Sequence, residues 1–459
     1  MFPYTLMRAI TGTALRWYYR DIQVEGRERI PRDRPLIVVV NHPNALVDAL
    51  LVVWVVPRRV LLTAKSTIFV NPLASVLLRW LGVLPLFRTS DVARGGTRPD
   101  PSRNRDTFRA VVAALRAGGA VMIFPEGKSH DDPSLAPLKS GAARMALEAM
   151  SSDHAANLAI VPIGLTFERK EEPRTRVLVQ IGEPLAMESW RRPEKGAADA
   201  LTTEIDTRLR AVTLNYATTD DAARAARIAS LVAAVFEGLP EIGVVDRRLG
   251  DEAAIARRID DLAARIARAG ASARAQAEEL LQRLDALQRS AAEHGILLED
   301  VRISLASRRA ARFVAREGWL LLVGGPFALW GRINHWLPFR AARLIAARSV
   351  ESAADPAMRT LVAGAALVLV AYLLQTVAVG LLFGVVPAII YLISLPVTAD
   401  INFYLSDRLR RAMRRAKAFV RFQRDPRLRV RLANEITALR EDIALFDRML
   451  RAETRAARA

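Results

Sequence analysis

The sequence predicts an α/β domain followed by a helical region and a membrane-inserted hairpin near the C-terminus. Three observations carry this prediction. Strand-like apolar runs alternate with helical patterns over residues 20–216, as in α/β domains. Residues 217–316 are rich in Ala, Arg, Leu and Glu at helical spacing. Residues 360–399 carry no charge, and one transmembrane helix needs only about 20 such residues.

The composition favours an anionic partner, and a membrane surface first. The chain has 459 residues, of which 51% are hydrophobic, so it is too long for a single ordinary core. Lys and Arg number 67 against 48 Asp and Glu, which gives a formal charge of +19. Such an excess favours phospholipid, nucleic acid or a phosphorylated substrate. The absence of cysteine excludes disulfides, thiolate catalysis and cysteine-based zinc sites, and it fits a reducing cytoplasm.

The N-terminal 21 residues do not resemble a signal peptide. Arg8, Arg16 and Arg20 divide the apolar residues, so no continuous apolar core of a signal sequence is present. The spacing of the apolar residues predicts an interfacial amphipathic helix. A helix packed on its own domain is an equal alternative.

The elements of the α/β domain follow from periodicity and from glycine positions. Strand 36–40 is wholly apolar, which predicts burial on both faces. The helix over 104–117 ends at Gly118 and Gly119. The other predicted helices are 45–56, 71–80 and 140–150, and the other predicted strands are 22–26, 60–65, 82–88, 120–124, 158–167 and 176–182.

The region after the α/β domain predicts three or four amphipathic helices. Breaks are expected near Gly238, Gly270 and Gly295. The charge-rich helix faces are most simply solvated, and the alternative is a coiled-coil partner surface.

The uncharged run is long enough for two short passes through a membrane. Gly380, Gly384 and Pro387 lie near its middle and can break the helix. Arginines precede and follow the run, so the positive-inside rule places both flanks in the cytoplasm. A hairpin or re-entrant pair is therefore preferred over one crossing, and a buried helical core is the alternative. The apolar segment 318–331 is too short and too glycine-rich to span, so we expect it to lie in the membrane interface.

The last segment of the chain is basic. After residue 402 there are 16 Arg or Lys and 7 Asp or Glu, a net charge of +9. Basic helices bind anionic headgroups at about 1 kcal/mol per residue near the surface. Nucleic acid is the competing partner for such a segment, but its position directly after the apolar run favours lipid. The patterns together divide the chain into 1–216, 217–316, 317–402 and 403–459.

An ionisable pair follows the second strand. His42 and Asp48 lie within an otherwise apolar run, where ionisable groups must be paired or used. Asn44 can cap the next helix, with Asp48 in its first turns, where a carboxylate is favoured. Asp48 can then accept the Nδ1 proton of His42 and leave Nε2 available as a general base. Taken alone, the His42–Asp48 pair has a routine alternative, which is a histidine at the end of a strand whose hydrogen bonds are satisfied by a cap.

A second polar stretch, "FPEGKSHDD", begins at Phe124 after the strand 120–124. Pro125 and Gly127 shape a turn that exposes backbone N–H groups, while Lys128 and Ser129 add a charge and a hydroxyl, which suits phosphate. It is not a P-loop, because the glycine five residues earlier is missing. A capped turn is the routine alternative.

Three further stretches accompany these two. "GVLPLFR" ends a strand with Arg88, "VPIG" contains Pro162 in a buried strand, and "PLKSGAA" opens a helix with Lys139. Each has an ordinary structural explanation on its own. Their order along the chain gives them weight.

"NHPNALVD", "GVLPLFR", "FPEGKS" and "VPIG" resemble the four motif blocks of the glycerolipid acyltransferase superfamily, the PlsC-like enzymes. The resemblance covers roughly residues 20–190. It implies a mixed sheet flanked by helices, and transfer of a fatty acyl group from acyl-CoA or acyl carrier protein to a hydroxyl of a glycerol phosphate or lysophospholipid. It implies no cofactor beyond the acyl donor and no metal, and a catalytic domain on the cytoplasmic face of a phospholipid membrane.

The resemblance also implies residue roles. His42 would be the catalytic base and Asp48 its orienting partner. Arg88, Glu126 and Gly127 would belong to the acceptor phosphate site, and Pro162 would shape a substrate pocket. The whole set of candidate substrate-binding residues is Arg88, Phe124, Pro125, Glu126, Gly127, Lys128, Ser129, Lys139 and Pro162.

Two departures from the usual pattern affect the subfamily and leave the activity in place. Five residues instead of four separate His42 from Asp48, and "FPEGKSHD" lacks the usual arginine. A membrane branch that acylates glycerol 3-phosphate or dihydroxyacetone phosphate is similar in both respects. The alternatives are a catalytically inactive lipid-binding protein and a lipid hydrolase or thioesterase, although the sequence has neither "GxSxG" nor a cysteine nucleophile.

Overall fold

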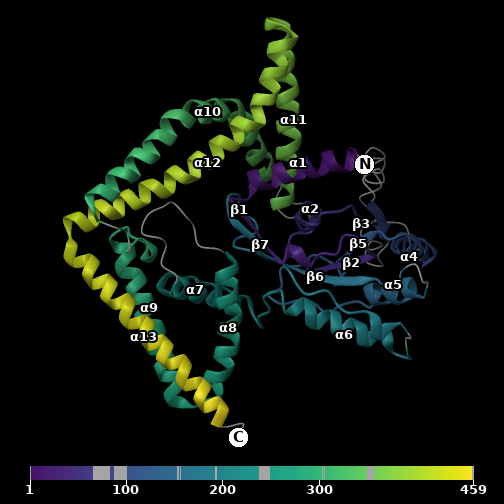
Figure 1. The fold of residues 1–459 in the computed structure, drawn as a ribbon, viewed down its shortest axis with the longest axis horizontal. Helices are drawn as coiled ribbons and strands as arrows, with labels where there is room; N and C mark the ends of the chain where they lie inside the picture. Colours follow the sequence, from purple (N-terminus) through teal and green to yellow (C-terminus); the bar gives the residue numbers. More distant parts are fainter. Residues whose placement is uncertain are drawn as a thin grey trace. The chain divides into compact units, whose positions relative to one another are not determined.

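The computed structural model (Figure 1) describes residues 2–65, 83–86, 101–151, 155, 157–191, 194–236, 249–301, 303, 305–348 and 356–456. The chain divides into two units. The first unit comprises Met1–Thr218 and Glu351–Leu361, and the second comprises Thr219–Val350 and Val362–Ala459.

A seven-stranded mixed sheet forms the centre of the first unit. Its strand order is β1-β7-β6-β2-β5-β3-β4. All neighbours are parallel except β6 and β7, which form an antiparallel pair. This confirms the expected mixed sheet. The strands are β1 Asp21–Glu25, β2 Leu36–Val40, β3 Val60–Lys65, β4 Val83–Leu86, β5 Ala120–Ile123, β6 Ala159–Phe167 and β7 Arg176–Ile181.

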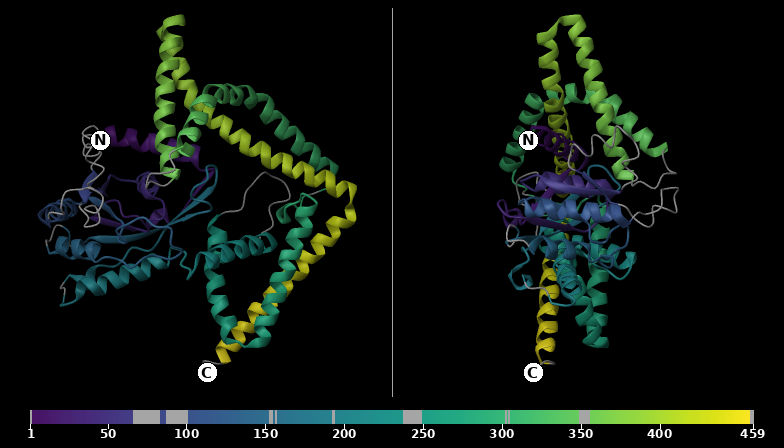
Figure 2. Two further views of the ribbon diagram at one scale, coloured as in Figure 1. Left: turned by 180° about the vertical axis from the view of Figure 1, so that it is seen from behind. Right: turned by 90° about the vertical axis from the view of Figure 1, so that its right-hand side faces the viewer.

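Helices lie on both sides of this sheet, as Figures 1 and 2 show. One prediction, the helix at 71–80, lies outside the described residues. The predicted helix at 104–117 begins earlier, at Pro101, because proline fits the first turn of a helix. The helices of the first unit are α1 Phe2–Tyr18, α2 Ala45–Val55, α4 Pro101–Arg116, α5 Gly141–Met150 and α6 Ala197–Arg210, with short 3₁₀ turns η1 Arg27–Arg29 and η5 Glu188–Trp190.

Strand β2 is buried on both faces, as its apolar sequence predicts. Alternate side chains point to opposite faces of a strand. Leu36, Val38 and Val40 join the apolar cluster that includes residues of α1 and α2. Ile37 and Val39 join the cluster formed with α4, α5 and α6. The end of β2, where His42 follows, is therefore held from both sides.

Helix α1 combines the two alternatives drawn from its sequence. Leu15 and Tyr18 are buried in the core of the first unit. Leu6 and Ile10, nearer the N-terminus, are 51% and 44% exposed. One part of the helix is thus packed on its own domain, and the other presents apolar side chains outward.

The second unit consists of helices. Gly270 separates α8 from α9 and Gly295 follows α9, both with positive φ, as expected; Gly238 lies outside the described residues. Apolar residues of α7, α8, α9, α12 and α13 form one core. The helices are α7 Thr219–Phe236, α8 Leu249–Arg268, α9 Ala271–Glu293, α10 Ser307–Arg348, α11 Pro356–Phe383, α12 Val385–Arg424 and α13 Pro426–Ala456, with a 3₁₀ turn η6 Leu298–Asp300.

The uncharged run forms two helices, as predicted. α11 ends at Phe383 and α12 begins at Val385, and Gly384 between them has φ 90°, a value that favours glycine. Both helices are long and apolar enough to cross a membrane by length and composition. The segment 318–331 is part of the 42-residue helix α10, which packs along α12.

Some arginines of the basic C-terminal segment face inward. Arg414 pairs with Glu299 at 2.7 Å, and Arg415, which is buried, lies 3.5 Å from the carboxylate of Asp300. Burial raises the pKa of Asp300, although the two arginines act in the opposite direction. Arg408 pairs with Glu317 of α10 at 2.6 Å. These arginines hold η6 and α10 on α12.

Gly164 in β6 lies close to the main chain of Val212, just after α6. This close approach predicts that a larger residue at position 164 destabilises the fold. A Cβ at Gly164 would overlap the carbonyl of Val212, and overpacking of this kind typically costs about 1–3 kcal/mol. We expect Gly164→Ala to lower the urea midpoint of unfolding. Gly141→Ala is the control, because a Cβ there meets nothing within 4 Å. Equal midpoints for the two variants would contradict the contact.

Candidate active site

The candidate site lies where β2, β5 and β6 end. Strand β2 runs parallel to both β5 and β6, so these ends lie at the same edge of the sheet. Asn41 and His42 follow β2, and Phe124 and Glu126 follow β5. The amide of Asn41 donates to Leu165 O at 3.1 Å and accepts from Leu165 N–H at 2.8 Å. Asn41 thereby ties β2 to β6 beside the site.

His42 and Asp48 form a hydrogen-bonded pair. His42 Nδ1 lies 3.0 Å from Asp48 Oδ2, and Asp48 is fully buried in the first turn of α2. The same oxygen accepts from the Asn44 N–H at 2.7 Å. A carboxylate oxygen only accepts, so Nδ1 carries the hydrogen of this bond. The side chain of Asn44 does not cap α2, contrary to expectation, and its amide donates to Tyr19 Oη and Lys170 O.

The ring of His42 is fixed by more than its partner. It stacks on the ring of Phe124, with centroids 3.7 Å apart and planes inclined by 9°. Its main-chain N–H donates to Glu126 Oε1 at 2.8 Å. Among the described residues no hydrogen bond reaches His42 Nε2, and His42 lines a pocket. The arrangement therefore leaves Nε2, the ring nitrogen that is not bonded to Asp48, available at the pocket.

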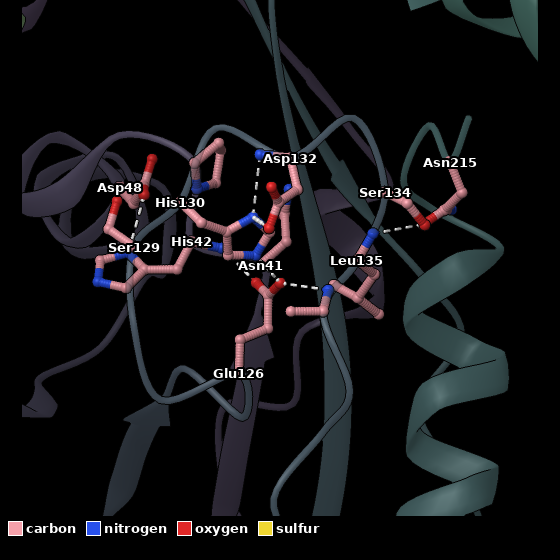
Figure 3. A network of polar contacts seen from close by, with 12 residues as sticks. Asn41, His42, Asp48, Glu126, Ser129, His130, Asp132, Ser134, Leu135 and Asn215 are labelled. Carbon is pink, nitrogen blue, oxygen red and sulfur yellow. Dashed lines mark hydrogen bonds and ion pairs between the residues drawn. The ribbon is translucent and has the colours of Figure 1, made fainter. Parts of the chain in front are cut away.

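Glu126 is an internal acceptor. It is 3% exposed. Its Oε2 accepts from the Ala136 N–H at 2.8 Å and contacts His130 Nε2, while its Oε1 takes the His42 N–H. The His130 N–H in turn donates to His42 O at 3.3 Å. Glu126 and His130 together hold the main chain on both sides of His42 and the loop at 136 (Figure 3).

The turn after β5 needs a glycine for two reasons. Gly127 has φ 75°, a region that favours glycine. A Cβ there would also meet the Lys139 side chain, with Nζ at 2.7 Å. Ser129 Oγ accepts from the Ala45 N–H at 3.2 Å, so this hydroxyl satisfies a donor at the start of α2. Lys128 is exposed.

The other residues that the sequence predicts for the site have structural contacts or lie outside the described residues. Buried Pro125 accepts from the Lys139 N–H at 2.9 Å and so fixes the start of the following segment. Pro162 pairs with Val39 in the sheet, and its carbonyl accepts from the Gly182 N–H at 2.9 Å. Arg88 lies outside the described residues. The structure thus brings His42, Asp48, Phe124, Glu126 and Ser129 together, with Gly127 and Lys139 beside the same turn.

A pocket of about 230 Å³ adjoins His42. Its cationic lining residues are Arg169 and Lys170, from the connection between β6 and β7. Lys170 Nζ donates to Pro43 O at 3.2 Å and pairs with Asp131. Burial acts to raise the pKa of Glu168, another lining residue, but hydrogen bonds and charge from Arg176 outweigh it and lower the pKa. Within the described residues no group of three or more acidic or histidine side chains is placed to hold a metal ion.

Three residues of the site were not assigned a role from the sequence. Asn41 could have been noticed as the first polar residue after five buried ones. His130 lies four residues after Glu126, but an irregular turn gives no period from which to infer their contact. Lys170 is separated from Pro43 by 127 positions, and nothing in its local sequence points to the site.

The sheet and the site together define an α/β domain within the first unit. The family model described as Acyltransferase matches residues 21–166, less than half of the chain, and this match confirms the resemblance given by the four motifs. Glycerol-3-phosphate O-acyltransferase 2 of Saccharomyces cerevisiae is 44% identical over 85 residues, or 18% of this chain and 11% of the yeast protein.

Two further relatives have lower identity. The 1-acyl-sn-glycerol-3-phosphate acyltransferase of Cocos nucifera is 28% identical over 204 residues, or 41% of this chain and 60% of that protein. The crystal structure of the 1-acyl-sn-glycerophosphate acyltransferase PlsC from Thermotoga maritima is 21% identical, with 45% of this chain and 78% of that chain covered and a TM-score of 0.34. The chain thus spans less than two thirds of the length of either curated relative.

The three bonds to Glu126 predict a large effect of its removal. Glu126→Ala leaves two part-buried main-chain N–H groups, those of His42 and Ala136, without their acceptor, at about 1–3 kcal/mol each. We expect the free energy of unfolding to fall by about 3 kcal/mol or more, as measured by urea denaturation. Glu148→Ala is the control, because Glu148 is 56% exposed and pairs with Arg116 at 3.5 Å, a surface pair of about 0–1 kcal/mol. A loss no larger than that of the control would show that Glu126 does not hold the site together.

Proposed function

We propose that the chain is a membrane-associated O-acyltransferase. It transfers a fatty acyl group from acyl-CoA or acyl carrier protein to a hydroxyl of glycerol 3-phosphate, dihydroxyacetone phosphate or lysophosphatidic acid. The observation that carries the proposal is the pair of His42 Nδ1 and Asp48 Oδ2 at 3.0 Å, with His42 on the wall of a pocket. The names of the relatives from yeast and Cocos nucifera support the acceptor class.

In this mechanism His42 is the general base. A glycerol hydroxyl is a weak nucleophile, and a base within hydrogen-bond reach contributes about 10²- to 10⁴-fold. Nε2 takes the hydroxyl proton as the oxygen attacks the thioester carbonyl. The tetrahedral intermediate then expels the thiolate, which takes up the proton from His42. Asp48 holds the ring in the required tautomer and stabilises the imidazolium that forms in between.

The pocket suits the headgroup of the acceptor better than its acyl chain. At about 230 Å³ it is smaller than the ~300–1,000 Å³ of sites for drug-sized ligands. A glycerol phosphate headgroup is small and anionic. Lys170 lies on the pocket wall close to Pro43, the residue after His42. We therefore add Lys170 to Arg88, Lys128 and Lys139 as a candidate ligand of the acceptor phosphate.

Membrane association is the second part of the proposal. α11 and α12 provide two apolar helices of sufficient length, and arginines lie on both sides of them in the sequence. The positive-inside rule then favours a cytoplasmic position for both flanks and for the catalytic domain.

The base role predicts that His42→Ala loses at least about 10²-fold in turnover, while the urea midpoint stays close to that of the native chain. Asp48→Asn should also be severely impaired, since it favours the wrong tautomer. Thiol release from acyl-CoA, with and without each acceptor, is the measurement. His294→Ala is the control, because His294 is a half-buried histidine directly after α9 whose ring Nδ1 lies 2.8 Å from Ser290 O.

Three results would count against this role. More than about a tenth of native turnover in His42→Ala would exclude general-base catalysis of this size. Thiol release that needs no acceptor would indicate a hydrolase. No release with any acceptor would indicate a lipid-binding protein.

The proposed contact between Lys170 and the acceptor phosphate predicts that the KM for the acceptor rises when Lys170 is removed. A charge-assisted bond contributes about 1.5–3 kcal/mol, so Lys170→Ala should raise the KM for glycerol 3-phosphate by about 10- to 100-fold. The acyl-donor KM should barely move. Lys128→Ala, Lys139→Ala and Arg88→Ala test the other candidates in the same assay, and exposed Lys195 supplies the control Lys195→Ala. A rise confined to the acyl donor would remove the residue concerned from the acceptor site.

A further inference from the structure

The uncharged part of α12 is the shorter leg of the α11–α12 hairpin. In α12 the uncharged residues 385–399 are followed by exposed Asp400, so this leg is about 22 Å long at ~1.5 Å per residue. The hydrocarbon core of a bilayer is ~30 Å thick. Both legs meet at Gly384, and the shorter one sets how far the turn can travel. The uncharged part of α12 alone is too short to bring Gly384 to the opposite face, although the whole helix is long and apolar enough to cross.

A group of polar side chains joins α10 to both legs. His335 Nε2 lies 2.7 Å from Tyr372 Oη, and Gln375 Nε2 donates to Asn334 O at 3.2 Å. Tyr391 Oη donates to Asn334 Oδ1 at 2.5 Å. We call these five residues the polar node. Polar groups are costly in hydrocarbon, whereas tyrosine is enriched at the membrane interface.

The polar node lies close to the turn of the hairpin. Gln375 is nine residues before Gly384 and Tyr391 seven after it, which is about 10–14 Å of helix on each leg. Half of the hydrocarbon core is ~15 Å. A node at the interface therefore leaves the turn near the middle of the bilayer.

Helix α10 has the character of an interfacial helix at this level. Arg332 and Arg340 are exposed on either side of the node residues, and their charges must reach water or headgroups. The Arg340 guanidinium lies over the Trp336 ring at 5.4 Å, and the Trp330 ring meets Tyr391 edge-on at 6.0 Å. Tryptophan and arginine at one level are typical of a membrane interface. Exposed apolar side chains of α10 include Trp319, Leu322, Phe327, Ile333 and Leu337.

The tip of the hairpin carries strongly exposed apolar side chains. Leu381 and Val385 are 83% and 73% exposed. In Figures 1 and 2 the ends of α11 and α12 extend beyond α10, which belongs to the same unit. An apolar projection of this kind marks a surface that is covered by another apolar phase.

We infer that α10 and the hairpin form a single-leaflet anchor: α10 lies in the interface of one leaflet, and the tip of α11–α12 enters the hydrocarbon of that leaflet and returns without crossing. This inference rests on the proposed membrane association. A spanning hairpin would bury Asp400 together with Arg332 and Arg340 in hydrocarbon. The partner is thus the acyl layer of one leaflet, and the polar node sets the depth.

Fluorescence quenching in vesicles measures this depth. The chain has no cysteine, so Phe383→Cys at the tip, Phe327→Cys on α10 and exposed Thr437→Cys on α13 each take one environment-sensitive fluorophore. Each full-length variant is reconstituted in phosphatidylcholine–phosphatidylglycerol vesicles that contain lipids with a nitroxide near the headgroup or near the end of the acyl chain. We expect residue 383 to be quenched several-fold more by the deep nitroxide, residue 327 more by the shallow one, and residue 437 by neither.

Two outcomes overturn the inference. If the fluorophore at position 383 is quenched best by the shallow nitroxide, and the unlabelled Phe383→Cys variant reacts with an impermeant maleimide from the opposite side, the hairpin spans the bilayer. If neither 383 nor 327 is quenched, the chain does not insert. Acyl transfer by the same variants in detergent micelles is measured alongside, so failure of the anchor and failure of the proposed enzyme activity are distinguished.

Discussion

The candidate site depends on one buried carboxylate, that of Glu126. It accepts the main-chain N–H of His42 from the end of β2 and that of Ala136 from the loop after β5, and it contacts His130. A buried carboxylate is stable only when its oxygens are satisfied. Glu126 therefore fixes these chain segments relative to each other, and the position of the His42 ring follows from that. In this respect Glu126 positions the site and does not itself have to touch a substrate.

A second buried carboxylate then sets the chemistry of His42. Asp48 is fully buried and takes two hydrogen bonds on Oδ2, one from His42 Nδ1 and one from the Asn44 N–H. The Asn44 N–H orients the Asp48 carboxylate independently of the His42 ring. With Phe124 stacked on the ring, rotation about both side-chain bonds of His42 is restricted. Glu126 thus holds the backbone of His42, while Asp48 and Phe124 hold its side chain, and Nε2 is left to face the pocket.

The sequence predicted elements with a clear period and contacts between residues close in the chain. The two-sided burial of β2 and the break at Gly384 follow from local pattern, and so does the His42–Asp48 pair, which is six residues apart. The Asn44 side chain was misplaced because its amide bonds Tyr19 and Lys170, which are distant in the sequence. Lys170 could not be found, because its contact with Pro43 depends on how β6 and β7 are connected. The 42-residue length of α10, which contains Pro326 and Pro338, was not predicted, because it depends on packing along α12, which is distant in the sequence.

The basic C-terminal segment shows why net charge alone is a weak guide to a membrane surface. Its net charge of +9 after residue 402 includes Arg408, Arg414 and Arg415, which pair with acidic residues of the same unit. A paired arginine contributes little field at a distance, because its partner cancels it within about a Debye length, ~8 Å at physiological salt. Only outward-facing residues such as Arg410 and Lys417 remain to attract anionic lipid. In the proposed single-leaflet anchor, the apolar tip and the polar node would determine the depth of the chain in a membrane, and the exposed basic residues would act on its orientation and on which lipids surround it.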